Sequence, residues 1–180
     1  MKALKEPLRR EMRARLRSEA TGLPTRSALI RRQIRSLPFW GSARTVGLFC
    51  PLPGEPDLLP LMEEEGRRFV FPRIEGVGLA WHEVGKIAEL EATQTRGMEH
   101  LRQPAGGVSL PTCEIELLLV PGLAFTRAGG RLGRGGGYYD RVLAELETGA
   151  RSVGVCFEFQ ILEELPLEDH DMRVQRVCAG

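Results

Sequence analysis

The stretch that decides the fold begins with ELLLVPG at residues 116–122, an apolar run of strand length. GGRLGRGGG follows at 129–137, with six glycines in nine residues, and then a helical pattern, YYDRVLAELE, at 138–147. A second β-rich run, SVGVCF, occupies residues 152–157. Strands that are apolar throughout are typical of parallel sheets covered on both faces. Strand, glycine loop, helix and strand in this order therefore predict a βαβ unit.

The same alternation is present upstream. TVGLFC at residues 45–50 and RFVFP at 68–72 are short β-rich runs. Between them the pattern of Asp57 to Glu65 predicts a helix, which completes a second βαβ unit. Residues 76–110 are richer in glycine and polar groups, so we expect peripheral hairpins or loops there, with one strand at Leu79 to Val84.

Two helices are expected ahead of these units. Apolar side chains recur at every fourth residue from Leu4 to Leu16, which predicts a helix from Ala3 to Ser18. Thr25 can cap a second helix that Pro38 ends. Strands that alternate with helices predict an α/β fold, a three-layer α/β/α sandwich with a mostly parallel central sheet. Ligands are expected beyond the carboxyl ends of its strands.

Length and composition narrow the class of protein. A chain of 180 residues suits a single domain spanning residues 1–180. Hydrophobic residues make up 42% and charged residues 27%, which excludes wholesale disorder. No apolar run approaches the roughly 20 residues of a membrane helix, so we expect a cytoplasmic protein without a membrane partner. The four cysteines form no CxxC pair, and neither a disulfide framework nor a zinc site is indicated.

Charge is distributed unevenly along the chain. Residues 1–35 carry 11 basic and three acidic side chains, a net charge of +8. The remaining 14 basic and 21 acidic side chains give residues 36–180 a net charge of −7. The amino-terminal segment therefore favours an anionic ligand, either a nucleotide triphosphate or a nucleic acid, although a solvated helix surface explains such a charge run equally well.

The glycine-rich stretch favours a polyanion. Backbone N–H groups of glycines can close around a phosphate, and the helix that follows adds the positive end of its dipole. Arg131 and Arg134 inside the stretch add bidentate donors. It matches neither a Walker A sequence nor a dinucleotide fingerprint. A flexible linker or a tight turn is the plain alternative, but neither explains the arginines or the paired tyrosines, Tyr138 and Tyr139.

An acid beside bound phosphates would be repelled unless a cation lies between them. Asp140 occupies such a position, in the first turn of the helix after the glycines. Mg²⁺ prefers oxygen ligands and takes one or two protein carboxylates. A second acidic ligand is therefore expected, and the carboxyl-terminal segment contains two candidates, Asp169 and Asp171. The alternative interpretations are an acid that stabilises its own helix and a solvated loop.

Residues 120–143, VPGLAFTRAGGRLGRGGGYYDRVL, strongly resemble the signature of the 5-formyltetrahydrofolate cyclo-ligases, also called methenyltetrahydrofolate synthetases. Further similar segments are KEPLR at residues 5–9, the region around Glu55, FPR at 71–73 and HDM at 170–172. The resemblance implies an enzyme that uses ATP and Mg²⁺ to convert 5-formyltetrahydrofolate to 5,10-methenyltetrahydrofolate, with ADP and phosphate as products. It further implies phosphorylation of the formyl oxygen and ring closure by N10, which needs no protein nucleophile. We expect a monomer whose partners are small molecules.

The resemblance also implies which residues act. Lys5 and Arg9 are expected to bind ATP, together with the nucleotide loop, which comprises Arg131, Leu132, Gly133, Arg134, Gly135, Gly136, Gly137, Tyr138 and Tyr139. Asp140 and Asp171 are the implied magnesium ligands. The reduced folate is expected to contact Cys50, Glu55, Arg134, Gly135, Gly136, Gly137 and Tyr138. Arg134 and Tyr138 are the residues expected to act in catalysis.

Two positions depart from the family's usual pattern. Gly136 stands where a lysine is usual, which removes one cation from the phosphate site, and Thr126 stands where an aspartate is usual. The alternative from another class is a nucleic-acid-binding module that uses the basic amino-terminal helices. Against it, aromatic residues make up only 6% and no nucleic-acid-binding motif is present.

Overall fold

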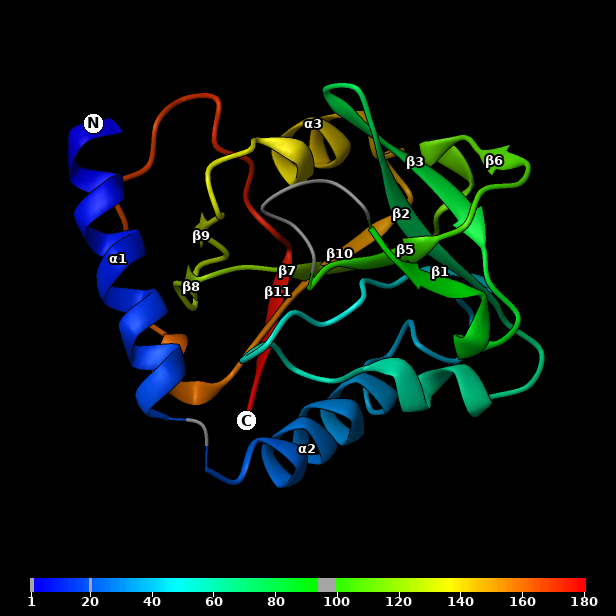
Figure 1. Cartoon of the computed structure of the whole chain (residues 1–180), viewed down its shortest axis with the longest axis horizontal. Coiled ribbons are helices and arrows are strands. Elements are labelled where there is room, and N and C mark those ends of the chain that lie inside the picture. Colours follow the sequence, from blue (N-terminus) through cyan, green and yellow to red (C-terminus); the bar gives the residue numbers. More distant parts are fainter. Residues whose placement is uncertain (1, 20, 94–99) are drawn as a thin grey trace.

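The computed structural model describes residues 2–19, 21–93 and 100–180. A seven-stranded sheet forms the centre of the molecule, in the order β11-β10-β7-β1-β2-β3-β6 (Figure 1). From β11 to β2 neighbouring strands pair in parallel, and β3 and β6 extend the sheet with antiparallel pairing. The predicted mostly parallel sheet is thereby confirmed. Its strands are β1 (Thr45–Gly47), β2 (Arg68–Glu75), β3 (Gly78–Glu83), β6 (Ser109–Leu110), β7 (Leu117–Pro121), β10 (Arg151–Cys156) and β11 (Arg176–Ala179).

Helices cover both faces of this sheet. In β7, Leu117 and Leu119 belong to the apolar cluster that contains Ile30 of α2, because alternate side chains of a strand point to opposite faces. Leu118 belongs instead to the cluster that contains Val142 of α3. Figure 1 shows these two helices on opposite sides of the sheet, so the predicted three-layer arrangement is confirmed. Their bounds are Leu23–Arg35 for α2 and Tyr138–Glu145 for α3.

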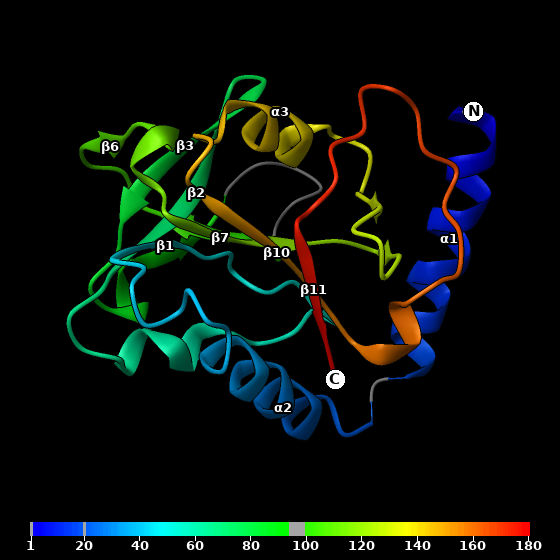
Figure 2. The ribbon, with the colours of Figure 1, turned by 180° about the vertical axis from the view of Figure 1, so that it is seen from behind.

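The first helix, α1 (Lys2–Ser18), stands beside the sheet rather than over a face (Figure 1). Its buried side chains Met12 and Leu16 join the same apolar cluster as α2. Seen from behind, the segment that connects β10 to β11 runs alongside α1 (Figure 2). At its carboxyl end β7 leads into the small antiparallel pair β8 (Ala124–Phe125) and β9 (Arg131–Leu132), which lies next to α1 in both views.

Four expectations about elements need correction. Helix α2 begins at Leu23 after Gly22, so Thr25 lies inside the helix and does not cap it. The helix expected over Asp57 to Glu65 is a short 3₁₀ helix, η1 (Leu59–Glu63), which has Pro60 in its first turn and ends before the extended residue Glu64. Proline is tolerated in the first turn of a helix but has no N–H donor. A segment of five residues forms only a short 3₁₀ turn. Strand β1 ends at Gly47, not at residue 50. The edge strand β11 was not expected, because only part of it is apolar.

The stretch from 76 to 110 contains the expected peripheral elements, although its residues 94–99 lie outside the described ones. Strands β2 and β3 form a hairpin, and β4 (Leu90–Ala92) pairs with β5 (Arg102–Pro104). Pro72 is tolerated within β2 because β1 pairs only with the first residues of that strand. The remaining 3₁₀ helices are η2 (Ile87–Glu89), η3 (Thr112–Glu114) and η4 (Glu158–Gln160). Within the described ranges, no helix has the length and apolar character needed to cross a membrane.

Candidate active site

A cavity of about 1220 Å³ lies between α1, the carboxyl ends of the central strands, the glycine loop and the segment that precedes β11. Single small molecules usually occupy pockets of about 300–1,000 Å³, so this volume suits two substrates together. Every residue that the family resemblance implies for ATP, folate or magnesium lines it. These residues are Lys5, Arg9, Cys50, Glu55, Arg131, Leu132, Gly133, Arg134, Gly135, Gly136, Gly137, Tyr138, Tyr139, Asp140 and Asp171.

Helix α1 holds the glycine loop by its carbonyl groups. Arg9 Nε donates to the Gly133 carbonyl at 3.0 Å, and Arg13 Nη2 donates to the Arg134 carbonyl at 3.3 Å. Gly137 precedes α3 with φ 65°, a conformation that favours glycine. The loop therefore runs between two helices, and a basic stripe of α1 faces it.

Lys5 joins α1 to the segment that precedes β11. Its Nζ donates to Glu168 Oε2 at 2.8 Å and to Asp171 Oδ2 at 2.5 Å, and its side chain is 6% exposed. Burial alone would lower the pKa of Lys5, but the hydrogen bonds to Asp171 and Glu168 outweigh it and raise that pKa. Burial likewise opposes the charge of Asp171, yet the hydrogen bond from Lys5 leaves its pKa lowered. Both groups are therefore charged at neutral pH.

Arg134 crosses the cavity to Glu55. Its Nη2 and Nε donate to Glu55 Oε1 at 2.7 and 3.0 Å. The Glu55 side chain is only 4% exposed, and its other oxygen accepts the N–H of Leu52 at 3.0 Å. A buried carboxylate with a guanidinium and an amide donor stays fixed in position, so Glu55 can orient Arg134 toward a substrate.

Arg131 points to Asp140 rather than outward. Its side chain is 4% exposed, and Nη2 donates to Asp140 Oδ1 at 2.9 Å. The N–H of Met172 donates to the same oxygen at 3.4 Å, which brings the residue after Asp171 against Asp140. Arg131 Nε is buried without a hydrogen-bond partner among the described residues. Arg131 therefore pairs with Asp140 and still has N–H donors that are free of hydrogen bonds among the described residues.

Two buried titratable groups of the cavity, Cys50 and Tyr139, are uncharged at neutral pH. Burial raises the pKa of the Cys50 thiol to about 12, so this residue is a packed thiol at neutral pH and no nucleophile. Burial of its hydroxyl group also raises the pKa of Tyr139. Tyr138 lies half-buried with the Arg141 guanidinium 5.3 Å from its ring centre. Tyr138 thus presents an aromatic surface to the cavity.

An apolar wall of the cavity was not predicted as part of the site. It is formed by Phe49, Pro72, Ile74, Leu79 and Met172. Phe49 follows β1, and Met172 lies in the segment before β11. The other three residues belong to the hairpin of β2 and β3, where sequence patterns indicate only a core or an edge. The available signal was that Pro72 and Met172 lie in two of the segments that resemble the family, at residues 71–73 and 170–172.

Of the tail acids, the structure brings Asp171 to the cavity, whereas Asp169 is exposed and is not part of its lining. Ligand atoms of Glu168, His170 and Asp171 lie within 4.8 Å of one another. Asp171 and Asp140 line the same cavity and are carboxylates, the donors that Mg²⁺ prefers. The residues present therefore fit this cation.

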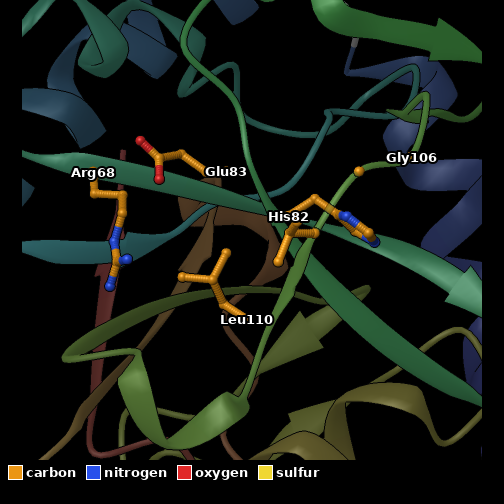
Figure 3. Close-up of a pocket in the computed structure, with 7 residues that line it drawn as sticks. Arg68, His82, Glu83, Gly106 and Leu110 are labelled. Atoms are coloured by element: carbon orange, nitrogen blue, oxygen red, sulfur yellow. The ribbon is translucent and has the colours of Figure 1, made fainter.

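A second, smaller hollow of about 350 Å³ contains none of the predicted site residues (Figure 3). The ring of His82 points away from Arg68 and Glu83. Arg68 is paired with Glu114 at 2.7 Å. No converging polar groups are therefore found there among the described residues.

Comparisons with known proteins identify the family of the chain. The model of the 5-formyltetrahydrofolate cyclo-ligase family matches residues 1–180. A 5-formyltetrahydrofolate cyclo-ligase of Mycolicibacterium smegmatis is 34% identical over 148 residues, which are 76% of this chain and 73% of the relative. The mouse enzyme of the same name is 26% identical, over 96% of this chain and 92% of its own.

Solved structures are similar as well. The NMR structure of Aquifex aeolicus 5,10-methenyltetrahydrofolate synthetase matches with a TM-score of 0.81 and 30% identity, over 98% of this chain and 89% of that chain. A 5,10-methenyltetrahydrofolate synthetase from Mycoplasma pneumoniae matches with a TM-score of 0.74 over 97% of each chain. At 17% identity the latter supports the fold alone.

Proposed function

Because the chain belongs to the 5-formyltetrahydrofolate cyclo-ligase family, we propose that it converts 5-formyltetrahydrofolate to 5,10-methenyltetrahydrofolate with ATP and Mg²⁺, releasing ADP and phosphate. The observation that carries this proposal is the single cavity that has a cationic, glycine-rich side and an apolar side. The cationic side suits a triphosphate, and the apolar side suits the rings of a reduced folate.

The phosphates lie along the glycine loop in this proposal. Backbone N–H groups of Gly133 to Gly137 and the amino end of α3 supply donors, and Lys5 and Arg9 supply positive charge from α1. The folate lies against Tyr138, Cys50 and the apolar wall. This arrangement puts the formyl group next to Arg134, whose guanidinium Glu55 holds in place.

Asp140 and Asp171 would hold the magnesium ion. The cation would neutralise charge on the nucleotide phosphates as the γ-phosphoryl group is transferred. Arg131 contributes indirectly, because it fixes the carboxylate of Asp140 at 2.9 Å. The N–H of Met172, the residue after Asp171, also donates to Asp140 Oδ1 at 3.4 Å, so a backbone contact links the two proposed ligands.

The chemistry follows from the weak reactivity of a formamide. Its carbonyl is a poor electrophile because the N5 lone pair is delocalised into it, and its oxygen is a poor leaving group. Transfer of the γ-phosphoryl group to the formyl oxygen gives an activated iminium-like phosphate and ADP. N10 then attacks the formyl carbon, the C–O bond breaks as phosphate leaves, and N10 loses its proton. The protein supplies position and charge neutralisation, with Arg134 and Tyr138 next to the reacting group.

We further propose that residues 1–180 form one domain that acts as a cytoplasmic monomer on small-molecule substrates. Lys5 and Arg9, at the start of the basic segment, line the cavity, which favours a role of this segment in nucleotide binding. The rival nucleic-acid-binding function requires those side chains to face a polymer instead.

Equilibrium titrations test this choice. Calorimetry should detect binding of ATP with Mg²⁺, and weaker binding when EDTA replaces the metal. Single-stranded RNA, titrated at two salt concentrations, should give no comparable signal. Salt-sensitive binding of RNA without binding of ATP would contradict the proposed function and favour the rival.

A further inference from the structure

The Lys5 ammonium group lies between two carboxylates that are not equivalent. One, Asp171, is a proposed magnesium ligand, whereas the other, Glu168, has no proposed role. Lys5 Nζ lies 2.8 Å from Glu168 Oε2 and 2.5 Å from Asp171 Oδ2. An ammonium group has three N–H donors, so one donor remains for a phosphate oxygen in the cavity that Lys5 lines.

A hydrogen bond from the backbone of Glu168 to the side chain of Asp171 joins these two acids. The N–H of Glu168 donates to Asp171 Oδ2 at 2.6 Å, so the two residues face Lys5 across a short turn. The Lys5 side chain is 6% exposed, and the side chains of Asp171 and Glu168 are 12% and 26% exposed. A cation this deeply buried needs an opposite charge in contact with it, since solvent supplies little compensation.

A divalent cation on Asp171 would change this balance. The Asp171 carboxylate would then be shared with the metal, and two cations would lie side by side. Glu168 is the other carboxylate that contacts Lys5 among the described residues. We propose that Glu168 is a positioning residue, which keeps the Lys5 ammonium group at the phosphate side of the cavity once Asp171 binds the metal. This inference rests on the proposed function.

The test compares ATP binding by wild-type protein and Glu168→Gln, with Mg²⁺ and with EDTA, by calorimetry. We expect the variant to bind ATP about 10-fold more weakly with Mg²⁺, the scale of one lost charge-assisted hydrogen bond. In EDTA, Asp171 still holds Lys5, and the loss should be less than about 3-fold. In turnover, the KM for ATP should rise while kcat stays within about 2-fold.

Two further variants serve as controls. Glu164→Gln removes an exposed carboxylate from the same segment, outside the cavity, and should bind ATP as the wild type does. In a Lys5→Met background, Glu168→Gln should weaken binding no further, because its effect passes through the ammonium group. Should Glu168→Gln fail to fold, Glu168→Asp serves instead, with a loss of about 3-fold expected with Mg²⁺.

The outcomes separate the inference from the function on which it rests. Unchanged or tighter binding by Glu168→Gln overturns the inference, as does an equal loss with Mg²⁺ and with EDTA. A further loss in the Lys5→Met background also overturns it. If the wild type itself binds no ATP, the proposed function fails and the inference fails with it.

Discussion

Each acidic residue with a proposed role in the site forms an ion pair with a basic residue of the same site. Asp171 contacts Lys5, Asp140 contacts Arg131 and Glu55 contacts Arg134. These pairs fix the side chains while they keep charged groups at the cavity wall, ready to exchange partners with phosphates and a cation. At the scale of single residues, the site is therefore a set of matched charges.

Replacing Asp140 by asparagine should remove a metal ligand without disturbing the fold. The variant keeps the shape of the side chain and an oxygen for Arg131, but it loses the negative charge. We expect kcat/KM to fall by at least about 100-fold, the scale of losing one electrostatic stabiliser of a transition state. Steady-state turnover at several Mg²⁺ concentrations measures this, with the thermal midpoint as a fold control. Unaltered turnover would remove Asp140 from the metal site.

The ring of Tyr138 leaves no room for a side chain at Gly136. A Cβ atom there would lie 2.8 Å from the ring of Tyr138, closer than real contacts allow. Gly136→Ala should therefore displace the ring and raise the KM for the folate about 10-fold, an estimate based on one misplaced contact. A lysine at this position would carry the same Cβ atom and meet the same ring. Gly136→Lys would therefore do more than restore the cation that is usual in the family.

The control for this variant is Gly41→Ala, where nothing lies within 4 Å of an added Cβ. Both variants should unfold at similar temperatures, and the folate KM of Gly41→Ala should match the wild type. Equal folate KM values for Gly136→Ala and the wild type would show that the ring of Tyr138 gives way freely.

Helix α1 connects the core to the cavity at the scale of elements. Met12 is fully buried in the apolar cluster, whereas Lys5 and Arg9 reach the cavity. Met12→Ala should lower the free energy of unfolding by about 2–4 kcal/mol, since it leaves an unfilled space in the core. Leu4→Ala is the matched control, because Leu4 is 63% exposed and should cost less than about 0.5 kcal/mol. Urea denaturation measures both, and equal losses would contradict this role of α1.

The sequence predicted some elements and missed others for identifiable reasons. β7 and β10 are buried on both faces, so their apolar runs were unambiguous. η1 was expected as a longer helix, because periodicity shows an apolar face but not how many turns the prolines permit. β11 was missed, since an edge strand needs few apolar residues and its pairing with β10 is a long-range contact.

Stability of the whole molecule should depend on pH through Glu116. The backbone N–H groups of Thr45 and Arg44 donate to its carboxylate and lower its pKa below the ordinary value of 4.5. The stabilisation from such a group is fully present above pH 4.5 and is lost as the pH falls through the lower pKa of the folded state. The free energy of unfolding should therefore fall with decreasing pH below about 4.5.

Urea denaturation of Glu116→Gln at pH 7, 4 and 3 tests this dependence. The variant should be less stable than the wild type at pH 7, and the difference should shrink as the pH falls. Glu147→Gln, which alters an exposed residue, should follow the wild type at each pH. A difference between Glu116→Gln and the wild type that stays constant with pH would contradict the role of its charge.

The sequence also predicted much of the site as a set of residues, because the glycine loop and its arginines are contiguous. Assembly of that set depends on chain segments that are far apart, such as α1 and the turn at Glu168 to Asp171. Pairings such as Arg134 with Glu55 join residues 79 positions apart, and no spacing rule reveals them. The apolar wall was missed for the same reason, since its residues meet only in the folded chain.

Formation of 5,10-methenyltetrahydrofolate, followed by its absorbance, tests the central claim most directly. Wild-type protein is mixed with 5-formyltetrahydrofolate and Mg²⁺, with ATP present or omitted, and ADP is measured in parallel. The proposed function predicts product only when ATP is present, with one ADP released for each methenyl group formed. Product at the same rate without ATP, or hydrolysis of ATP without product, would contradict the claim that one cavity joins the two substrates.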